Sequence, residues 1–167
     1  DYQLKNLFIE NSKNSFLFKG IADVENIKDF LNLYSEYAVL RNPESFYSNS
    51  LHDDIDIICE SRSRLIRFLG AVPSTNSRSR VLFDVPHRNG SIKVDLRSPE
   101  DRYYPTNWSY KMLKNRIYNK KLNINQINLE DQYYSLVYHA IIHKKKISPD
   151  YPEKINKIYS ALNNKKN

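Results

Sequence analysis

The sequence predicts an α+β fold, in which helices flank a mixed β-sheet and a helical region follows at the C-terminus. Three observations support it: helical spacing of apolar residues in 23–36, two strand patterns joined at Asn89-Gly90, and helical patterns after residue 100. We therefore expect an α/β core at 1–100 and a helical extension at 101–167, packed on the core as one compact unit. Because the chain begins with Asp rather than Met, we also expect other domains of a longer protein as partners.

The N-terminal half is expected to alternate helices with strands. A helix is predicted at 23–36, where Asp23 can cap the N-terminus and apolar residues recur every three or four positions. A second helix, at 61–69, is expected to stop at Gly70. The remaining elements are a short strand or helix start at 15–19, strands at 37–41 and 54–59, and a polar loop at 42–52.

The C-terminal half is expected to begin with strands and to end with helices. The Asn89-Gly90 pair predicts a β-hairpin, because this dipeptide is the commonest tight hairpin turn. The strands are predicted at 71–74, 80–86 and 91–97. The helices are predicted at 108–119, 128–146 and 148–164, with Ser148 as the cap of the last one and Pro149 in its first position.

The composition limits the classes of function. The chain carries 26 lysines and arginines against 19 acidic residues, and its formal charge of +7 favours phosphate-bearing or otherwise anionic partners. Only three glycines occur, and the absence of G-x-G-x-x-G and Walker A patterns excludes two common nucleotide-binding loops. The single cysteine, Cys59, excludes an internal disulfide and a cysteine-rich zinc site. Because no apolar segment is long enough to cross a membrane, we expect no membrane span and a cytoplasmic location.

Three aspartates stand among apolar strand residues, at Asp54, Asp56 and Asp95. Residues two apart in a strand point to the same face, roughly 7 Å apart, so Asp54 and Asp56 share a face. If 91–97 is a neighbouring strand, Asp95 can approach them, and three close carboxylates repel one another unless a cation meets them. Oxygen clusters of this kind suit Mg²⁺ or Mn²⁺. Asp84 is a rival for the third place, but Pro86 suggests that its strand is about to end.

The motifs "AVLRN", "HDDIDI" and "IKVDLR" together resemble the nucleotidyltransferase (polymerase-beta-like) superfamily, over roughly residues 23–97. "HDDIDI" in particular resembles the acidic element of LicD and fukutin-type glycan phosphotransferases. The resemblance implies a nucleotidyltransferase-like fold in which Asp54, Asp56 and Asp95 are the catalytic residues and the ligands of Mg²⁺ or Mn²⁺. It implies an enzyme that moves a nucleotidyl, phospho-alditol or phosphocholine-type group from a nucleotide-activated donor to a hydroxyl acceptor, with a glycan as the favoured acceptor.

The phosphate-binding part of that family pattern is different in this chain. The superfamily usually carries a Gly-Ser pair shortly before the acidic motif, and "YAVLRNPESFYSNS" has none. Arg41, Ser48 and Ser50 are the candidate donors in its place, although Arg41 could equally form an ion pair with a nearby aspartate. Lys93 and Arg97 flank Asp95 on its face, where they could neutralise a triphosphate or balance the carboxylates.

Two other functions remain open from the sequence. The same active site could belong to a toxin-type nucleotidyltransferase that modifies tRNA or a protein, and the positive charge suits RNA. The chain could also be a non-catalytic binding domain of a larger assembly. His139 and His143 lie four residues apart, and they read as a polar helix flank rather than a zinc site. A catalytic role for His143 with Lys144 stays open if this helix packs over the metal site.

Overall fold

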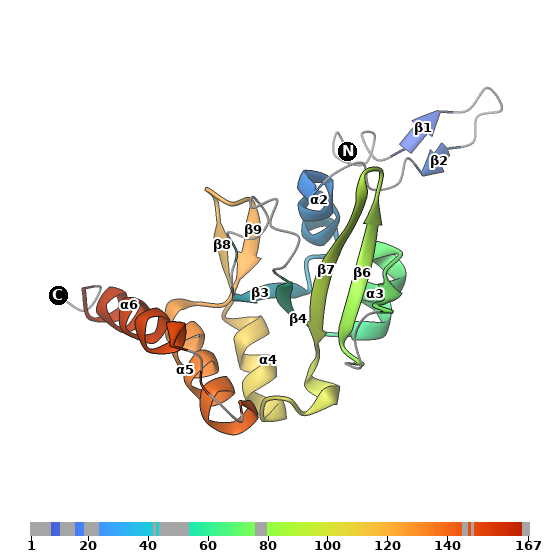
Figure 1. The fold of residues 1–167 in the computed structure, drawn as a ribbon. Helices are drawn as coiled ribbons and strands as arrows, with labels where there is room; N and C mark the ends of the chain where they lie inside the picture. The colour runs from blue at the N-terminus through green and yellow to red at the C-terminus, as the bar shows by residue number, and fades with distance from the viewer. Residues whose placement is uncertain are drawn as a thin grey trace.

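The computed structural model describes residues 24–41, 43, 54–75, 80–144, 147 and 149–164, together with two short strands at 8–10 and 16–18. Within these residues, a seven-stranded mixed sheet with helices packed on it confirms the predicted α+β fold (Figure 1). Across the sheet the strands run in the order β5 (Val72–Pro73), β6 (Leu82–His87), β7 (Gly90–Arg97), β4 (Ile55–Cys59), β3 (Tyr37–Arg41), β9 (Ile124–Gln126) and β8 (Ile117–Asn119). The two short strands, β1 (Phe8–Glu10) and β2 (Phe16–Phe18), form an antiparallel pair of their own.

The centre of the sheet combines parallel and antiparallel neighbours. β4 lies between β3, which is antiparallel to it, and β7, which is parallel to it. Parallel strands cannot be joined by a tight turn. The chain therefore leaves β4 through helix α3 (Arg62–Leu69), passes through β5 and β6, and returns along β7. This crossover sets residues of "DIDIIC" beside residues of "IKVDLR".

One face of the sheet is a closed apolar core. Helices α2 (Val24–Tyr34) and α3 cover it, because each of them presents an apolar stripe to the strands. Alternate residues of the strands complete the core, among them Val39, Ile55, Ile57, Val94 and Leu96. Burial of this many large side chains is the main source of stability of the fold.

The opposite face of the sheet holds a smaller core and the polar residues. Helix α4 (Thr106–Lys114) packs Met112 and Leu113 against Ala38, Leu40 and Ile58. Beyond α4 lie α5 (Leu129–Tyr138) and α6 (Asp150–Asn164), which contact each other (Figure 1). This second face is the one that carries Asp56 and Asp95.

Most of the predicted elements are confirmed, and the turn residues show why. The helix predicted at 61–69 ends at Gly70, whose φ of +62° is left-handed and readily adopted by glycine. The predicted hairpin joins β6 to β7, with His87 opposite Gly90. Its loop residues are Arg88 and Asn89, and Gly90 opens β7 with a φ of +147° rather than standing inside the turn.

Two of the predicted helices are wrong in part. The helix predicted at 108–119 ends at Lys114, and 117–119 is instead strand β8, which forms an edge hairpin with β9. β9 in turn pairs with β3, so non-local pairing overrides the local helical pattern here. The helix predicted at 128–146 changes at residue 139 into a π-helical turn, η3 (His139–His143). Ile141 lies in this turn and is 69% exposed.

Candidate active site

Asp56 and Asp95 are direct neighbours on the two central parallel strands. The register pairs Asp56 of β4 with Asp95 of β7, and the residues on either side of them, Ile57 and Leu96, point into the apolar core. The alternation of side chains along a strand therefore places both carboxylates on the opposite face, as the sequence predicts. Asp56 is only 7% exposed, so its charge needs a compensating partner.

The partner of Asp56 is Arg41, brought there by an irregularity in β3. The β3–β4 register shifts between Val39, which faces Ile57, and Arg41, which faces Asp56. Strict alternation would turn Arg41 toward the apolar core, whereas the bulge turns it toward the carboxylate. Its Nη2 and Nε donate to Oδ1 and Oδ2 of Asp56 at 2.5 and 3.1 Å. Burial opposes the charge of Arg41, but the charge and hydrogen bonds of Asp56, together with smaller contributions from Tyr104 and Tyr103, raise the pKa of the guanidinium above its usual value.

Asp95 has an arginine of its own, Arg97, two residues further along β7. Arg97 Nη2 donates to Asp95 Oδ2 at 2.9 Å, and its Nε lies 2.7 Å from Oδ1. The second contact is an ion pair without hydrogen-bond geometry, so the buried Oδ1 accepts no hydrogen bond from the described residues. Burial raises the pKa of Asp95 to about 6, Arg97 opposes the rise, and the nearby charge of Asp56 adds to it.

Tyr103 holds Arg97 in place from the other side. The guanidinium of Arg97 lies 3.8 Å from the centre of the Tyr103 ring, a cation–π contact. The opposite face of that ring stacks on His143, with centroids 3.9 Å apart and planes 12° from parallel. The hydroxyl of Tyr103 also contacts Nδ1 of His139. The π-helical turn thus brings both histidines to one tyrosine, and through it to the carboxylate pair.

A cavity of about 670 Å³, here called the carboxylate cavity, opens over these ion pairs. Its volume lies within the range of small-molecule sites. β3, β4 and β7 supply one wall, and α5 and α6 supply the other. The charged residues that line it are Arg41, Asp54, Asp56, Asp95, Arg97, Lys144, Lys154 and Lys157. Five cations thus face three carboxylates, and this excess favours an anionic ligand.

His139 adds no charge to this cavity near neutral pH. Burial lowers its pKa to about 3, and the positive charges of Arg41, Lys144 and other neighbours act in the same direction. Its ring lies parallel to that of Tyr151, at 6.0 Å between centroids. The two rings therefore form an uncharged part of the wall, between the arginines and the lysines.

The predicted site residues do not all come together. Asp54, Asp56, Asp95, Arg41 and Arg97 line the carboxylate cavity. Lys93 is not among the residues that line it and stands opposite Asp84 on β6, so its predicted role at a ligand phosphate gains no support from the geometry. Asp84 is likewise not paired with β4. Ser48 and Ser50 lie outside the described residues.

Several residues of the cavity were not predicted as site residues. Lys154, Lys157 and Tyr151 come from α6, a helix about 100 residues away from Asp54 in the sequence. The spacing of Lys154 and Lys157 puts them on one side of that helix, but lysines at such spacing usually face solvent, so the sequence carries no specific signal for them.

The carboxylates of this cavity are suitable ligands for a divalent cation, but their present arrangement is not that of a metal site. Carboxylate oxygens at the ends of adjacent strands are the ligands that Mg²⁺ and Mn²⁺ prefer, and Asp95 Oδ1 has no hydrogen bond to give up. However, no three His, Cys, Asp or Glu side chains in the part of the chain that the structure describes are grouped as metal ligands. Arg41 and Arg97 occupy the carboxylates instead, so a cation would have to compete with them.

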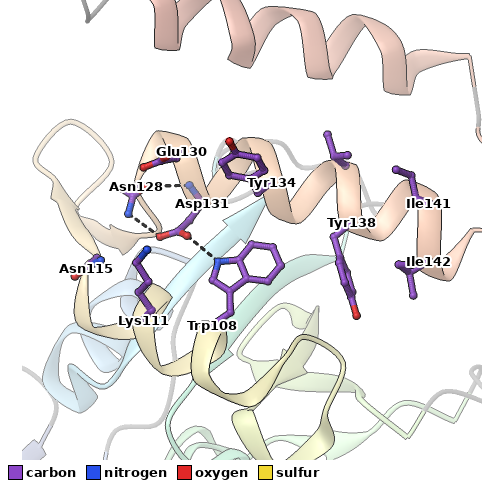
Figure 2. Close-up of a pocket in the computed structure, with 11 residues that line it drawn as sticks. Trp108, Lys111, Asn115, Asn128, Glu130, Asp131, Tyr134, Tyr138, Ile141 and Ile142 are labelled. Atoms are coloured by element: carbon purple, nitrogen blue, oxygen red, sulfur yellow. Dashed lines mark hydrogen bonds between the residues drawn. The ribbon is translucent and has the colours of Figure 1, made fainter.

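A second cavity, of about 470 Å³, lies on the other side of α5 (Figure 2). Its central feature is Asp131, whose carboxylate accepts hydrogen bonds from Trp108 Nε1 at 2.9 Å and from Asn128 Nδ2 at 2.6 Å. Asn128 also caps α5 by accepting from the backbone N–H of Asp131. Because these polar groups satisfy one another, they tie α4 to α5 rather than offering free groups to a ligand. We therefore place the candidate active site at the carboxylate cavity.

Comparison with protein-family models, with curated proteins and with solved structures gives no match. Among the described residues, no helix combines the length and the apolar character needed to cross a membrane.

Proposed function

We propose that the protein is a Mg²⁺- or Mn²⁺-dependent transferase. It moves a nucleotidyl, phospho-alditol or phosphocholine-type group from a nucleotide-activated donor to a hydroxyl acceptor, with a glycan as the favoured acceptor. The observation that carries the proposal is the register pair Asp56–Asp95, facing a cavity whose far wall carries lysines. A carboxylate pair held rigidly on strands beside a basic, ligand-sized cavity suits a phosphorylated substrate.

Each charged group of the cavity has a defined part in this proposal. Asp54, Asp56 and Asp95 would hold the divalent ion, which would polarise a phosphoryl oxygen and neutralise developing charge. Lys144 and Lys157 would attract the phosphates of the donor from the opposite wall, together with Lys154, which is paired with Asp150 at 2.8 Å. Because the guanidinium fork matches two phosphate oxygens, Arg41 could also bind the donor directly.

The test is a calorimetric titration of Mn²⁺ into the wild type and Asp56→Asn, with and without CTP, ATP, GTP or UTP. We expect Asp56→Asn to lose metal binding while the fold survives, and one nucleotide to strengthen binding to the wild type. Asp84→Asn is the matched control, because Asp84 lies on β6, the strand next to β7, but does not line the cavity. Absence of binding by the wild type under every condition would favour a non-catalytic binding domain.

RNA is the alternative acceptor, and the formal charge of +7 favours it. A toxin-type nucleotidyltransferase that acts on tRNA would use the same carboxylates. Its affinity for tRNA should fall steeply as the salt concentration rises, because phosphate contacts release counterions. Measurement of tRNA binding between 50 and 200 mM salt distinguishes this acceptor from a neutral glycan, whose binding should change little.

A further inference from the structure

The two arginines that neutralise the carboxylates are held very differently. Arg97 is bound on two sides, by Asp95 and by the ring of Tyr103, which is itself stacked on His143. Arg41 is bound through Asp56, and none of the described aromatic rings lies over its guanidinium. It also stands at the last position of β3, next to the bulge, where the strand pairing ends.

We propose that Arg41 is an exchangeable counter-ion of Asp56, released when a divalent cation and a phosphate group bind together, whereas Arg97 stays on Asp95. This inference rests on the proposed function, because it concerns how the same site accepts its metal and its phosphorylated ligand. It assigns the two arginines separate roles that their similar contacts to carboxylates do not reveal.

Release of Arg41 follows from competition for the same oxygens. Both oxygens of Asp56 already accept from the Arg41 fork, so a cation that binds this carboxylate competes with the guanidinium for the same oxygens and repels its positive charge at close range. The Arg41 side chain is 14% exposed, and a guanidinium at such a depth is costly to leave without an anion. A phosphate group in the carboxylate cavity would supply that anion.

Coupling between the two ligands is the measurable consequence. A divalent cation alone must displace Arg41 without compensation and should bind weakly. A phosphate alone meets an arginine that is already paired and should also bind weakly. When both bind, the phosphate pairs with the released Arg41 and the cation pairs with Asp56, so neither charge is left without a partner. The cation and the phosphate should therefore raise each other's affinity by the same factor.

The first experiment measures Mn²⁺ affinity by calorimetry with and without inorganic phosphate, in the wild type, Arg41→Gln and Arg97→Gln. We expect phosphate to raise the Mn²⁺ affinity of the wild type about 5-fold or more, the lower end of typical couplings between sites. Arg41→Gln should bind Mn²⁺ alone more tightly than the wild type, and phosphate should no longer increase that affinity. Arg97→Gln should keep the effect of phosphate.

The second experiment needs no substitution and observes the arginine side chains directly. The Nε–H NMR signals of Arg41 and Arg97 are followed in the wild type during addition of Mg²⁺ and phosphate. We expect the Arg41 signal to shift and to lose its protection against exchange with water, while the Arg97 signal keeps its protection. An Arg41 signal that stays protected when Mg²⁺ is bound overturns the inference, even if Arg41→Gln does not fold.

The outcomes separate the two proposals. If the wild type binds Mn²⁺ and Arg41→Gln binds it with equal affinity and equal response to phosphate, the exchange is refuted and the metal site stands. If neither protein binds Mn²⁺, both the exchange and the proposed function are refuted.

Discussion

The two faces of the β3–β4–β7 sheet are built from alternate residues of the same strands, yet they do opposite things. On one face Ile55, Ile57 and Leu96 are sealed under α2 and α3. On the other, Asp56 and Asp95 meet two arginines at the edge of a cavity. An apolar face can thus anchor a strand firmly enough to hold buried charges in fixed positions on its reverse side.

The largest effect should come from weakening the anchoring face. Ile57→Ala removes a side chain with no exposed surface and leaves a cavity, so we expect a loss of about 3 kcal/mol in the free energy of unfolding. Urea denaturation followed by circular dichroism measures it. Ile141→Ala is the control, because Ile141 is 69% exposed and its truncation should change stability by about 0.5 kcal/mol or less. Equal effects of the two changes would contradict the anchoring role of the buried apolar face.

A smaller effect should follow from unpairing a charge on the other face. Arg41→Met leaves Asp56 at low exposure without its partner, and we expect a loss of roughly 2 kcal/mol at pH 7. This loss is smaller than that for a fully buried ion pair, because the pair lies at a cavity that is open to water. The double change Arg41→Met with Asp56→Leu should recover most of this loss in the same denaturation experiment. A double variant no more stable than Arg41→Met would show that the pair is not the source of the loss.

Asp131 is a buried carboxylate held by neutral donors, in contrast to the ion-paired Asp56 and Asp95. Asp131 accepts from Trp108 and Asn128, so Trp108→Phe removes one hydrogen bond while keeping an aromatic ring in place. We expect a loss of about 1.5 kcal/mol in the free energy of unfolding, the value for a hydrogen bond to a charged group. The Mn²⁺ affinity should stay unchanged, since Trp108 does not line the carboxylate cavity. A reduced Mn²⁺ affinity would instead connect the two sides of α5.

The smallest effect should be a pH dependence from His139. Its pKa is lowered to about 3 in the folded protein, against about 6.5 in an unfolded chain. Between these values the unfolded chain binds the proton and the folded protein does not, so stability falls as the pH drops from about 6.5 toward 3. Because His139 is partly open to the cavity, this contribution is modest. His139→Gln should lose less stability than the wild type between pH 7 and pH 5 in thermal denaturation, and parallel curves would contradict the assignment.

Local pattern was enough to predict much of the site. Strand alternation alone puts Asp54 and Asp56 on one face of the sheet. It also puts Val94 and Leu96 on the face opposite to that of Asp95. Both predictions are confirmed. The preference for Asp95 over Asp84 as the partner of the acidic motif agrees with the register. The assignment of metal binding to these aspartates stays a prediction.

The edge hairpin shows where local pattern fails. Residues 117–119 follow a helical pattern, but they pair with β9, and β9 pairs with β3 across almost 90 residues of sequence. The available signal lay in the turn, where Asn119 accepts a hydrogen bond from the backbone of Leu122 and Asn123 adopts a φ of +54°. Asparagines are favoured in such turns, so Asn119 and Asn123, four positions apart, could have suggested a hairpin.

Which side chains share a face follows from local sequence, because the period of a strand or helix depends only on neighbouring residues. The position of the aspartates opposite an apolar core follows from it too. Three other features come from the packing of distant segments: Asp95 lies beside Asp56, a bulge turns Arg41 toward Asp56, and lysines of α6 line the far wall of the cavity. These placements depend on pairing between distant segments, whose register and packing are set by the whole fold rather than by any local pattern.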